Sequence, residues 1–140
     1  MTGGRGRAAA AQPTGPQWCI DRYVACDTAP ARARHDVQLS LRAWGLDHLV
    51  DDARLIVSEL VTNAIRHTRT GAVGVSVTRL SGHVRIVVTD DSSTLPARVP
   101  PAADAEAGRG LQLVDQLATR WGSQPLPTGK RVWAELPTHG

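Results

Sequence analysis

Three polar side chains share one stripe of a predicted helix. Glu59, Asn63 and His67 follow one another at intervals of four residues in a largely apolar segment. At about 100° of rotation per residue they fall within an arc of roughly 80°, and the apolar Ile56 and Leu60 lie in or beside that arc. A carboxylate and an amide that border an apolar face need hydrogen-bond partners or a ligand. The alternative is an ordinary solvated stripe on an amphipathic helix.

Two later segments carry chemistry of a different kind. Asp90 stands where a predicted strand ends, and an acid at that position can accept a hydrogen bond from the exocyclic amine of a nucleobase or can simply begin a turn. Gly108-Arg109-Gly110-Leu111 is predicted to open a helix, and the backbone N–H groups of a helix N-terminus hold phosphate well. A Gly-x-Gly pair would also suit a loop hinge. Each feature alone is weak evidence for a binding site, but the order of the features along the chain is informative.

Two successive helices are predicted to position the polar stripe. Pro30 suits the first turn of the first helix, and Gly45 is expected to end it. Asp47 is expected to cap the second helix, which continues to about Arg66. The apolar positions at helical spacing are Ala33, Val37, Leu41 and Trp44 in the first helix and Val50, Ala53, Val57, Leu60, Val61, Ala64 and Ile65 in the second.

Short β-favourable stretches predict four strands. Residues 18–26 form a plausible edge strand, and Ser81-Gly82-His83 is expected to join two antiparallel strands as a turn. The alternating apolar residues are Val73, Val75, Val77, Val84, Ile86 and Val88 in that hairpin and Val132, Ala134 and Leu136 in a closing strand.

A long loop and a last helix complete the predicted order. Residues 91–107 contain three prolines, and a long irregular segment in a small domain is often a lid over a site. An amphipathic helix follows, with its apolar positions at Leu111, Val114, Leu117, Ala118 and Trp121. This order predicts an α+β fold, a two-layer sandwich in which a mixed, mostly antiparallel sheet carries helices on one face.

Length and charge limit the function further. The chain has 140 residues and a mass of 14.9 kDa, which fits one domain at 18–140 after a disordered tail at 1–17. The net charge is +3, but two of these charges belong to Arg5 and Arg7 in the tail, and the body has no basic stripe. A nucleic-acid partner is therefore not expected. No apolar run is long enough to span a bilayer, and Cys19 and Cys26 are expected to be reduced thiols of a cytoplasmic protein.

The ordered motifs resemble the GHKL ATPase superfamily, which includes type II topoisomerases, histidine kinases and mismatch-repair ATPases. The pattern is most similar to the compact anti-sigma-factor serine kinases and related histidine-kinase-like ATPase domains, over about residues 18–137. The resemblance implies the Bergerat (GHKL) fold. Asn63 matches the asparagine that holds Mg²⁺ on the nucleotide phosphates, and Glu59 matches the acid that activates the attacking hydroxyl or water. Asp90 matches the aspartate that reads adenine, and Gly108 and Gly110 match the glycines that wrap the phosphates.

Five further residues are candidates for nucleotide contacts. Gly129 matches a small motif before the last strand, and Leu111 completes the Gly-x-Gly-Leu pattern. Arg109 can meet phosphate charge from between the two glycines. His67 can touch the ligand, although it can instead bind the last carbonyls of its helix. Ser92 stands in the adenine box, where many relatives have glycine.

Three other classes fit the residues poorly. A P-loop is disfavoured, because Gly129-Lys130 is followed by arginine and position 124 is not glycine. A complete histidine kinase needs a phosphoacceptor hairpin, of which the short segment around His35 is only a faint likeness. A helix-turn-helix through Trp44-Gly45-Leu46 would present acidic side chains to DNA phosphates, which is the wrong sign.

The resemblance therefore predicts an ATP- and Mg²⁺-dependent serine/threonine protein kinase. By family analogy, its expected partners are a sigma factor and an anti-sigma-factor antagonist, and a homodimer is the assembly considered for binding them. The alternative hypothesis is a non-catalytic module that binds ATP and a protein partner. Glu59 favours catalysis over that alternative, because nucleotide binding alone would not require a base.

Overall fold

The computed structural model describes residues 18–68, 71–91 and 105–139, with the backbone alone for 105–110. The predicted tail at 1–17, Ser92 and most of the predicted lid lie outside the described residues. The domain boundaries expected from the sequence therefore stay a prediction.

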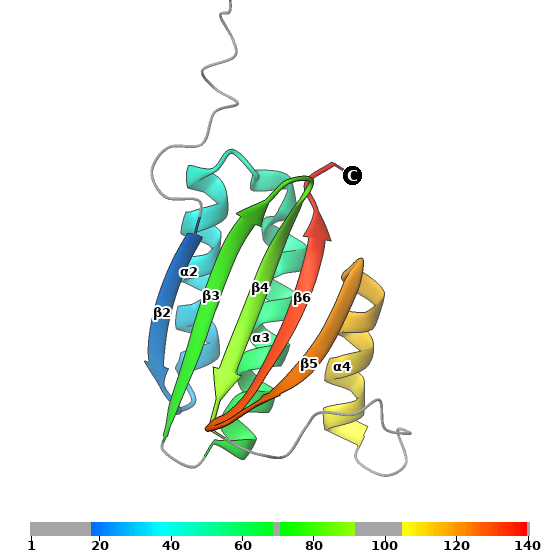
Figure 1. The fold of residues 1–140 in the computed structure, drawn as a ribbon. Helices are drawn as coiled ribbons and strands as arrows, with labels where there is room; N and C mark the ends of the chain where they lie inside the picture. Colours follow the sequence, from blue (N-terminus) through cyan, green and yellow to red (C-terminus); the bar gives the residue numbers. More distant parts are fainter. Residues whose placement is uncertain (1–17, 69–70, 92–104, 140) are drawn as a thin grey trace, which may run out of the picture.

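Five strands and three α-helices make up the described chain (Figure 1). In chain order the elements are β2 (Trp18–Val24), α2 (Ala29–Ala43), a short 3-10 helix (Asp47–Leu49), α3 (Val50–His67), β3 (Ala72–Leu80), β4 (His83–Asp90), α4 (Ala105–Leu117), β5 (Arg120–Leu126) and β6 (Gly129–Pro137). The strands form one sheet in the order β2-β3-β4-β6-β5.

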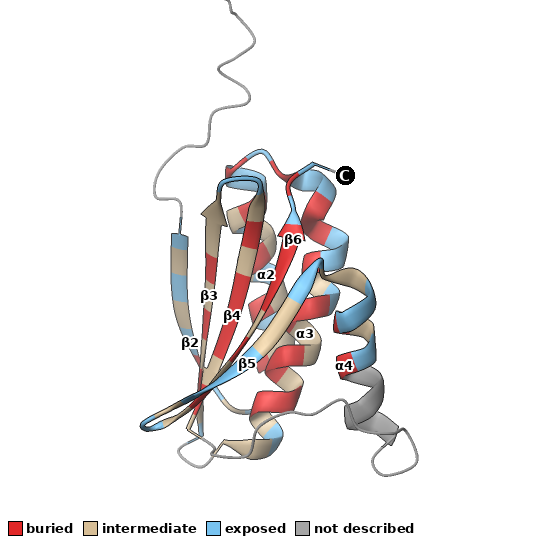
Figure 2. Cartoon of the chain, turned by 45° about the vertical axis from the view of Figure 1, so that its right-hand side comes forward, coloured by how far each residue is buried: buried red, intermediate tan, exposed pale blue. Residues whose placement is uncertain are grey.

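The helices lie on one face of the sheet, and the predicted α+β sandwich is confirmed (Figure 1). Buried residues gather between the two layers, on the inner faces of α2, α3 and the central strands (Figure 2). All four strand pairings in the described residues are antiparallel, so the sheet is not mixed as the sequence suggested. Turns join β3 to β4 and β5 to β6, the helices α2 and α3 connect β2 to β3, and α4 and β5 lie between β4 and β6 along the chain.

The first helix begins and ends as predicted. Pro30 lies in the first turn of α2, where a missing N–H costs nothing. Gly45 follows the helix with φ 73°, and the N–H groups of Gly45 and Leu46 donate to Arg42 and Leu41. This is a glycine-closed helix end that satisfies the last carbonyls. It turns the chain toward α3.

The start of the second helix differs from the prediction. Asp47 does not cap α3 but lies in the 3-10 helix before it, and Leu49 occupies the cap position without a side-chain hydrogen bond. Asp51 and Asp52 lie in the first turn, where negative charge stabilises the helix dipole. Burial of Val50 and the rest of the apolar stripe against the sheet accounts for a helix without a side-chain cap.

The β3–β4 hairpin and the segment after α4 also differ from the sequence prediction. Gly82 has φ 79° in the β3–β4 turn, as the tight connection requires, but His83 already pairs with Leu80 and belongs to β4. The strand β5 was not predicted from the sequence. Trp121, assigned there to the last helix, lies on β5, because α4 ends at Leu117.

The sheet face away from the helices is open (Figure 1). On β2 this open face carries the exposed side chains of Trp18, Ile20 and Val24. No helix in the described part of the chain is long and apolar enough to cross a bilayer.

Candidate functional site

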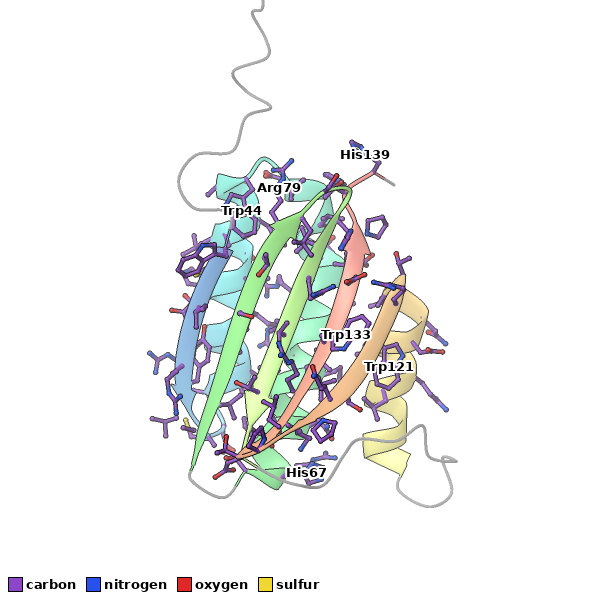
Figure 3. All side chains as sticks on the ribbon, viewed as in Figure 1. Trp44, His67, Arg79, Trp121, Trp133 and His139 are labelled. Carbon is purple, nitrogen blue, oxygen red and sulfur yellow. The ribbon has the colours of Figure 1, made fainter. Side chains whose placement is uncertain are left out.

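Buried polar side chains gather at one end of the two-layer core. The C-terminal half of α3, the end of β4 and the start of β6 all reach the lower end of the molecule in Figure 1. Three of the buried polar residues belong to these segments: Asn63, Asp90 and Lys130. His67, the last residue of α3, lies at the same lower end in Figure 3. This end of the molecule is the candidate site.

Asn63 is the buried member of the polar stripe on α3. Only 9% of its surface is exposed, and its amide makes no hydrogen bond with any side chain or backbone group that the structure describes. Among the described residues, the fully buried side-chain polar atoms without a partner are His67 Nδ1 and Arg131 Nε, so the amide atoms of Asn63 keep some access from outside. Asn63 is therefore placed to bind something that enters between the helices and the sheet.

Glu59 lies one turn before Asn63 and is half-buried. It borders a groove of about 430 Å³ on the outer side of α3, together with Arg34 from α2, Arg54 and Ser58. The Arg34 guanidinium donates to the Ser58 hydroxyl over 2.8 Å. The sequence analysis brought Glu59 and Asn63 to one stripe, but their surroundings differ: the amide is inside and the carboxylate is at the rim.

Asp90 ends β4 with its side chain in the core. Its carboxylate meets Lys130 directly across the sheet, where the lysine Nζ lies 3.1 Å from Oδ1 and 3.0 Å from Oδ2. The two side chains are 1% and 0% exposed. The sequence analysis named Asp90 but gave Lys130 no role. Only the antiparallel register of β4 and β6 shows that these two residues face each other.

Gly129 allows this contact. A Cβ at that position would lie 1.9 Å from the backbone oxygen of Asp90 and 2.6 Å from the Cα of Asp91. Only glycine permits the start of β6 to come this close to the end of β4. Its place in the candidate site is therefore structural: it brings Lys130 against Asp90.

His67 has one nitrogen in the protein interior. Its Nδ1 is buried and has no hydrogen-bond partner among the described residues. The backbone N–H of Thr68 completes the helix by donating to Ala64. His67 therefore lies at the candidate site with an unused polar atom.

The glycine motif lies inside a helix and does not open it. α4 begins at Ala105, so Gly108 and Gly110 stand after its first turn. The physical reason is local, since Ala105-Glu106-Ala107 are strong helix formers that extend the helix toward its N-terminus. The free N–H groups of the first turn therefore belong mainly to residues before Gly108. Arg109 shares this part of the helix backbone, and Leu111 is buried in the core at 5% exposure.

A second cavity lies on the opposite face of the sheet. It has a volume of about 390 Å³. Its lining includes Arg22, Gly74 and Thr89 of three neighbouring strands, and also Asp90, Asp91 and Thr128. Thr89 faces away from the buried Val88 next to it, but Asp90 lines the cavity as well. The cavity therefore reaches the end of β4 that belongs to the candidate site.

The donor set at the candidate site fits a magnesium–nucleotide ligand. No group of three or more His, Cys, Asp or Glu side chains converges within the described ranges of the chain. Mg²⁺ bound with a nucleotide takes one or two protein oxygens and draws its remaining ligands from phosphates and water. The single amide oxygen of Asn63 is compatible with that arrangement.

Comparison with known proteins gives the class of the molecule. The histidine kinase-like ATPase domain family matches residues 25–136, and the chain belongs to that family. This result confirms the resemblance to GHKL ATPases.

Individual proteins are similar to this chain in sequence or in fold. The chain is 41% identical over 83 residues to the uncharacterized protein SCO4941 of Streptomyces coelicolor, covering 56% of this chain and 79% of that protein. Its fold is similar to a crystal structure of the RsbU and RsbW domains of Rv1364c from Mycobacterium tuberculosis, with a TM-score of 0.67 and 20% identity. That match covers 89% of this chain but only 32% of the larger one.

A histidine kinase domain also shares the fold. The blue-light activated histidine kinase of Erythrobacter litoralis EL346 matches with a TM-score of 0.53 and 22% identity, over 78% of this chain and 59% of that one. The chain is therefore a histidine kinase-like ATPase domain with a Bergerat-type sandwich.

Proposed function

We propose that this domain binds Mg·ATP and transfers the γ-phosphoryl group to a serine or threonine of a small regulatory protein. The observation that carries the proposal is that Asn63, a largely buried residue without a hydrogen bond to the described side chains, lies at the same end of the core as Asp90. A metal or ligand would supply the partner that these side chains do not.

Each polar residue has a role in this proposal. Asp90 accepts a hydrogen bond from the amine of adenine, and the amide oxygen of Asn63 holds Mg²⁺. The bound metal supplies neutralisation of phosphate charge, which is the main requirement of phosphoryl transfer. The helix start around Ala105 offers N–H groups to the phosphates. In this proposal Gly108 and Gly110 follow the first residues of that helix.

Glu59 is the proposed base. The acceptor hydroxyl loses its proton to Glu59 while its oxygen bonds to the γ-phosphorus, and the bond from that phosphorus to the bridging oxygen breaks to release ADP. The groove beside Glu59 supports this role, because it gives a polypeptide segment access to the carboxylate from outside. Arg34 and Arg54 add positive charge on the side from which the acceptor would come.

The proposed partners follow from the resemblance. The acceptor is an anti-sigma-factor antagonist and the second partner is a sigma factor, in line with the fold shared with a protein that contains an RsbW domain. A homodimer and a cytoplasmic location remain predictions, as do nucleotide contacts through His67, Ser92 and Arg109.

Calorimetric titration with ATP, with and without Mg²⁺, tests the proposal. We expect wild type to bind ATP more tightly with Mg²⁺, and Asn63→Ala to lose at least about tenfold in Mg²⁺-dependent affinity, as removal of one charge-assisted contact would cause. Gln116→Ala removes an exposed amide on α4 and serves as the control. Equal affinities in wild type and Asn63→Ala would contradict the assignment. ATP binding without transfer to any co-purified protein would favour the non-catalytic module.

A further inference from the structure

Lys130 is the one lysine of the chain, and it is fully buried. It is the second residue of β6 and faces the helix layer beside Val132, opposite Asp90. Moving an ammonium group out of water is costly even when a carboxylate accompanies it. A buried apolar residue would have filled this position at no such cost. Packing alone therefore does not explain why this ammonium group is buried.

The hydrogen-bond capacity of Lys130 is not used up. An ammonium carries three N–H donors, and the contacts at 3.1 Å and 3.0 Å are both with the carboxylate of Asp90. At least one N–H is thus left without an acceptor among the residues that the structure describes. A buried donor in this state is rare in folded proteins and costs free energy.

We propose that Lys130 reads the nucleobase together with Asp90. This inference rests on the proposed function and adds a specificity-determining residue to the same site. Asp90 accepts from the exocyclic amine of the base, and the spare N–H of Lys130 donates to the unprotonated ring nitrogen next to that amine. In adenine these two atoms are the 6-amino group and N1, which lie side by side on one edge of the ring.

The fixed geometry of the pair supports this assignment. Cross-strand register holds Asp90 and Lys130 on the same face, and Gly129 lets the start of β6 lie close to the end of β4. The site therefore presents one acceptor and one donor next to each other. An aspartate alone would select only for the exocyclic amine of the base, whereas the Asp90–Lys130 pair also selects for a hydrogen-bond acceptor next to that amine.

Nucleotide analogues test the inference in the full-length protein. 1-deaza-ATP lacks the N1 acceptor and keeps the amine, while 7-deaza-ATP keeps both and controls for changes in the ring. We expect wild type to bind 1-deaza-ATP at least about tenfold more weakly than ATP, the loss expected for one hydrogen bond from a charged donor. 7-deaza-ATP should bind within about twofold of ATP.

Substitution of the lysine completes the test. Lys130→Met should bind ATP about tenfold more weakly than wild type and should no longer distinguish ATP from 1-deaza-ATP. Arg42→Met removes the same charge from an exposed position at the far end of α2 and should behave as wild type. Asp90→Asn/Lys130→Met keeps an acceptor without an unpaired buried charge. It replaces Lys130→Met if circular dichroism shows that the single variant is unfolded.

The outcomes separate the two proposals. Equal affinity of wild type for ATP and 1-deaza-ATP, or persistent discrimination in Lys130→Met, would overturn the role of Lys130 and leave ATP binding intact. Failure of wild type to bind any of the three nucleotides would overturn the proposed function as well.

Discussion

Asn63 and Glu59 are one helical turn apart, yet they lie in different surroundings. The amide is buried beside the sheet, and the carboxylate is half-buried at a groove that opens outward. The difference follows from the helix itself, because a rotation of about 40° separates positions four residues apart. One residue can therefore serve a bound nucleotide while the other faces an incoming acceptor.

Replacing Glu59 separates binding from transfer. In Glu59→Gln we expect ATP affinity within about twofold of wild type, since the side chain does not hold the nucleotide. Phosphoryl transfer should fall by roughly 10²- to 10⁴-fold, the usual contribution of a general base. Calorimetry and a radiolabel transfer assay on the co-purified acceptor measure the two effects. The control is Asp51→Asn, which removes another carboxylate from the same groove; an equal loss of transfer there would contradict a special role for Glu59.

The predictability of the site differs from residue to residue. Helical periodicity alone placed Glu59, Asn63 and His67 on one stripe, and the strand pattern placed Asp90 at the end of a strand, whereas the burial of Asp90 was not predicted. Lys130 was missed, because its contact depends on the register between two strands separated by forty positions in sequence. A lysine after Gly129 looks like a solvated strand start until the partner across the sheet is known.

At the scale of elements, the approach of β6 to β4 depends on one glycine. The ideal Cβ of an alanine at 129 would overlap the backbone of Asp90, and backbone cannot move aside as the end of a side chain can. The site residues Asp90 and Lys130 lie on these two strands. Any displacement of these two strands would affect both the stability of the domain and the proposed contact of Asp90 and Lys130 with the nucleobase.

Gly129→Ala is expected to lower the free energy of unfolding by about 2 kcal/mol or more, because overpacking against backbone is costly. Urea unfolding followed by circular dichroism measures the change. Gly71→Ala is the matched control: it has φ 79° and open space around the added carbon. That substitution should cost about 1 kcal/mol through strain alone. Similar losses in the two variants would show that close approach is not what position 129 requires.

The missing strand shows the limit of pattern reading for whole elements. Trp121 fits the helical spacing of Leu111, Val114 and Leu117, so the sequence assigned it to the helix. The rest of β5 is Gly-Ser-Gln-Pro-Leu, which has no apolar alternation. It forms a strand because β6 offers a free edge, and Pro125 is tolerated there since edge strands need fewer ladder donors. Pairing with β6, and not the local sequence pattern, makes this segment a strand.

At the scale of the whole molecule, Glu135 joins three strands on the open face of the sheet. Arg85 from β4 donates to Oε2 over 2.9 and 2.6 Å, and Arg120 from β5 donates to Oε1 over 3.0 and 2.9 Å. Both guanidinium groups also lie over the ring of Trp133, at 5.6 and 5.7 Å from its centre. Burial by itself raises the pKa of Glu135, but the hydrogen bonds from Arg85 and Arg120 outweigh it and lower that pKa below its ordinary value.

This lowered pKa predicts a pH-dependent contribution to stability. Because the folded pKa lies below the unfolded value of about 4.3, protonation favours the unfolded chain. We expect Glu135→Gln to unfold with roughly 1–3 kcal/mol less free energy at pH 7. The difference from wild type should shrink as pH falls below about 4.3 and through the lowered pKa of the folded protein.

Urea titrations between pH 7 and pH 3 measure this difference. Asp27→Asn, an exposed carboxylate between β2 and α2, should show no such trend. A difference between Glu135→Gln and wild type that stays constant or grows toward low pH would show that the ion pairs do not stabilise the fold.

The one-sided covering of the sheet has a geometric consequence for assembly. The helices cover one face of the sheet (Figure 1), while Trp18, Ile20 and Val24 of β2 are exposed on the other face. A protein seated on those three side chains would not contact Asn63, which is buried on α3 on the other side of the sheet. We therefore expect that such a protein and a ligand at Asn63 could bind in either order.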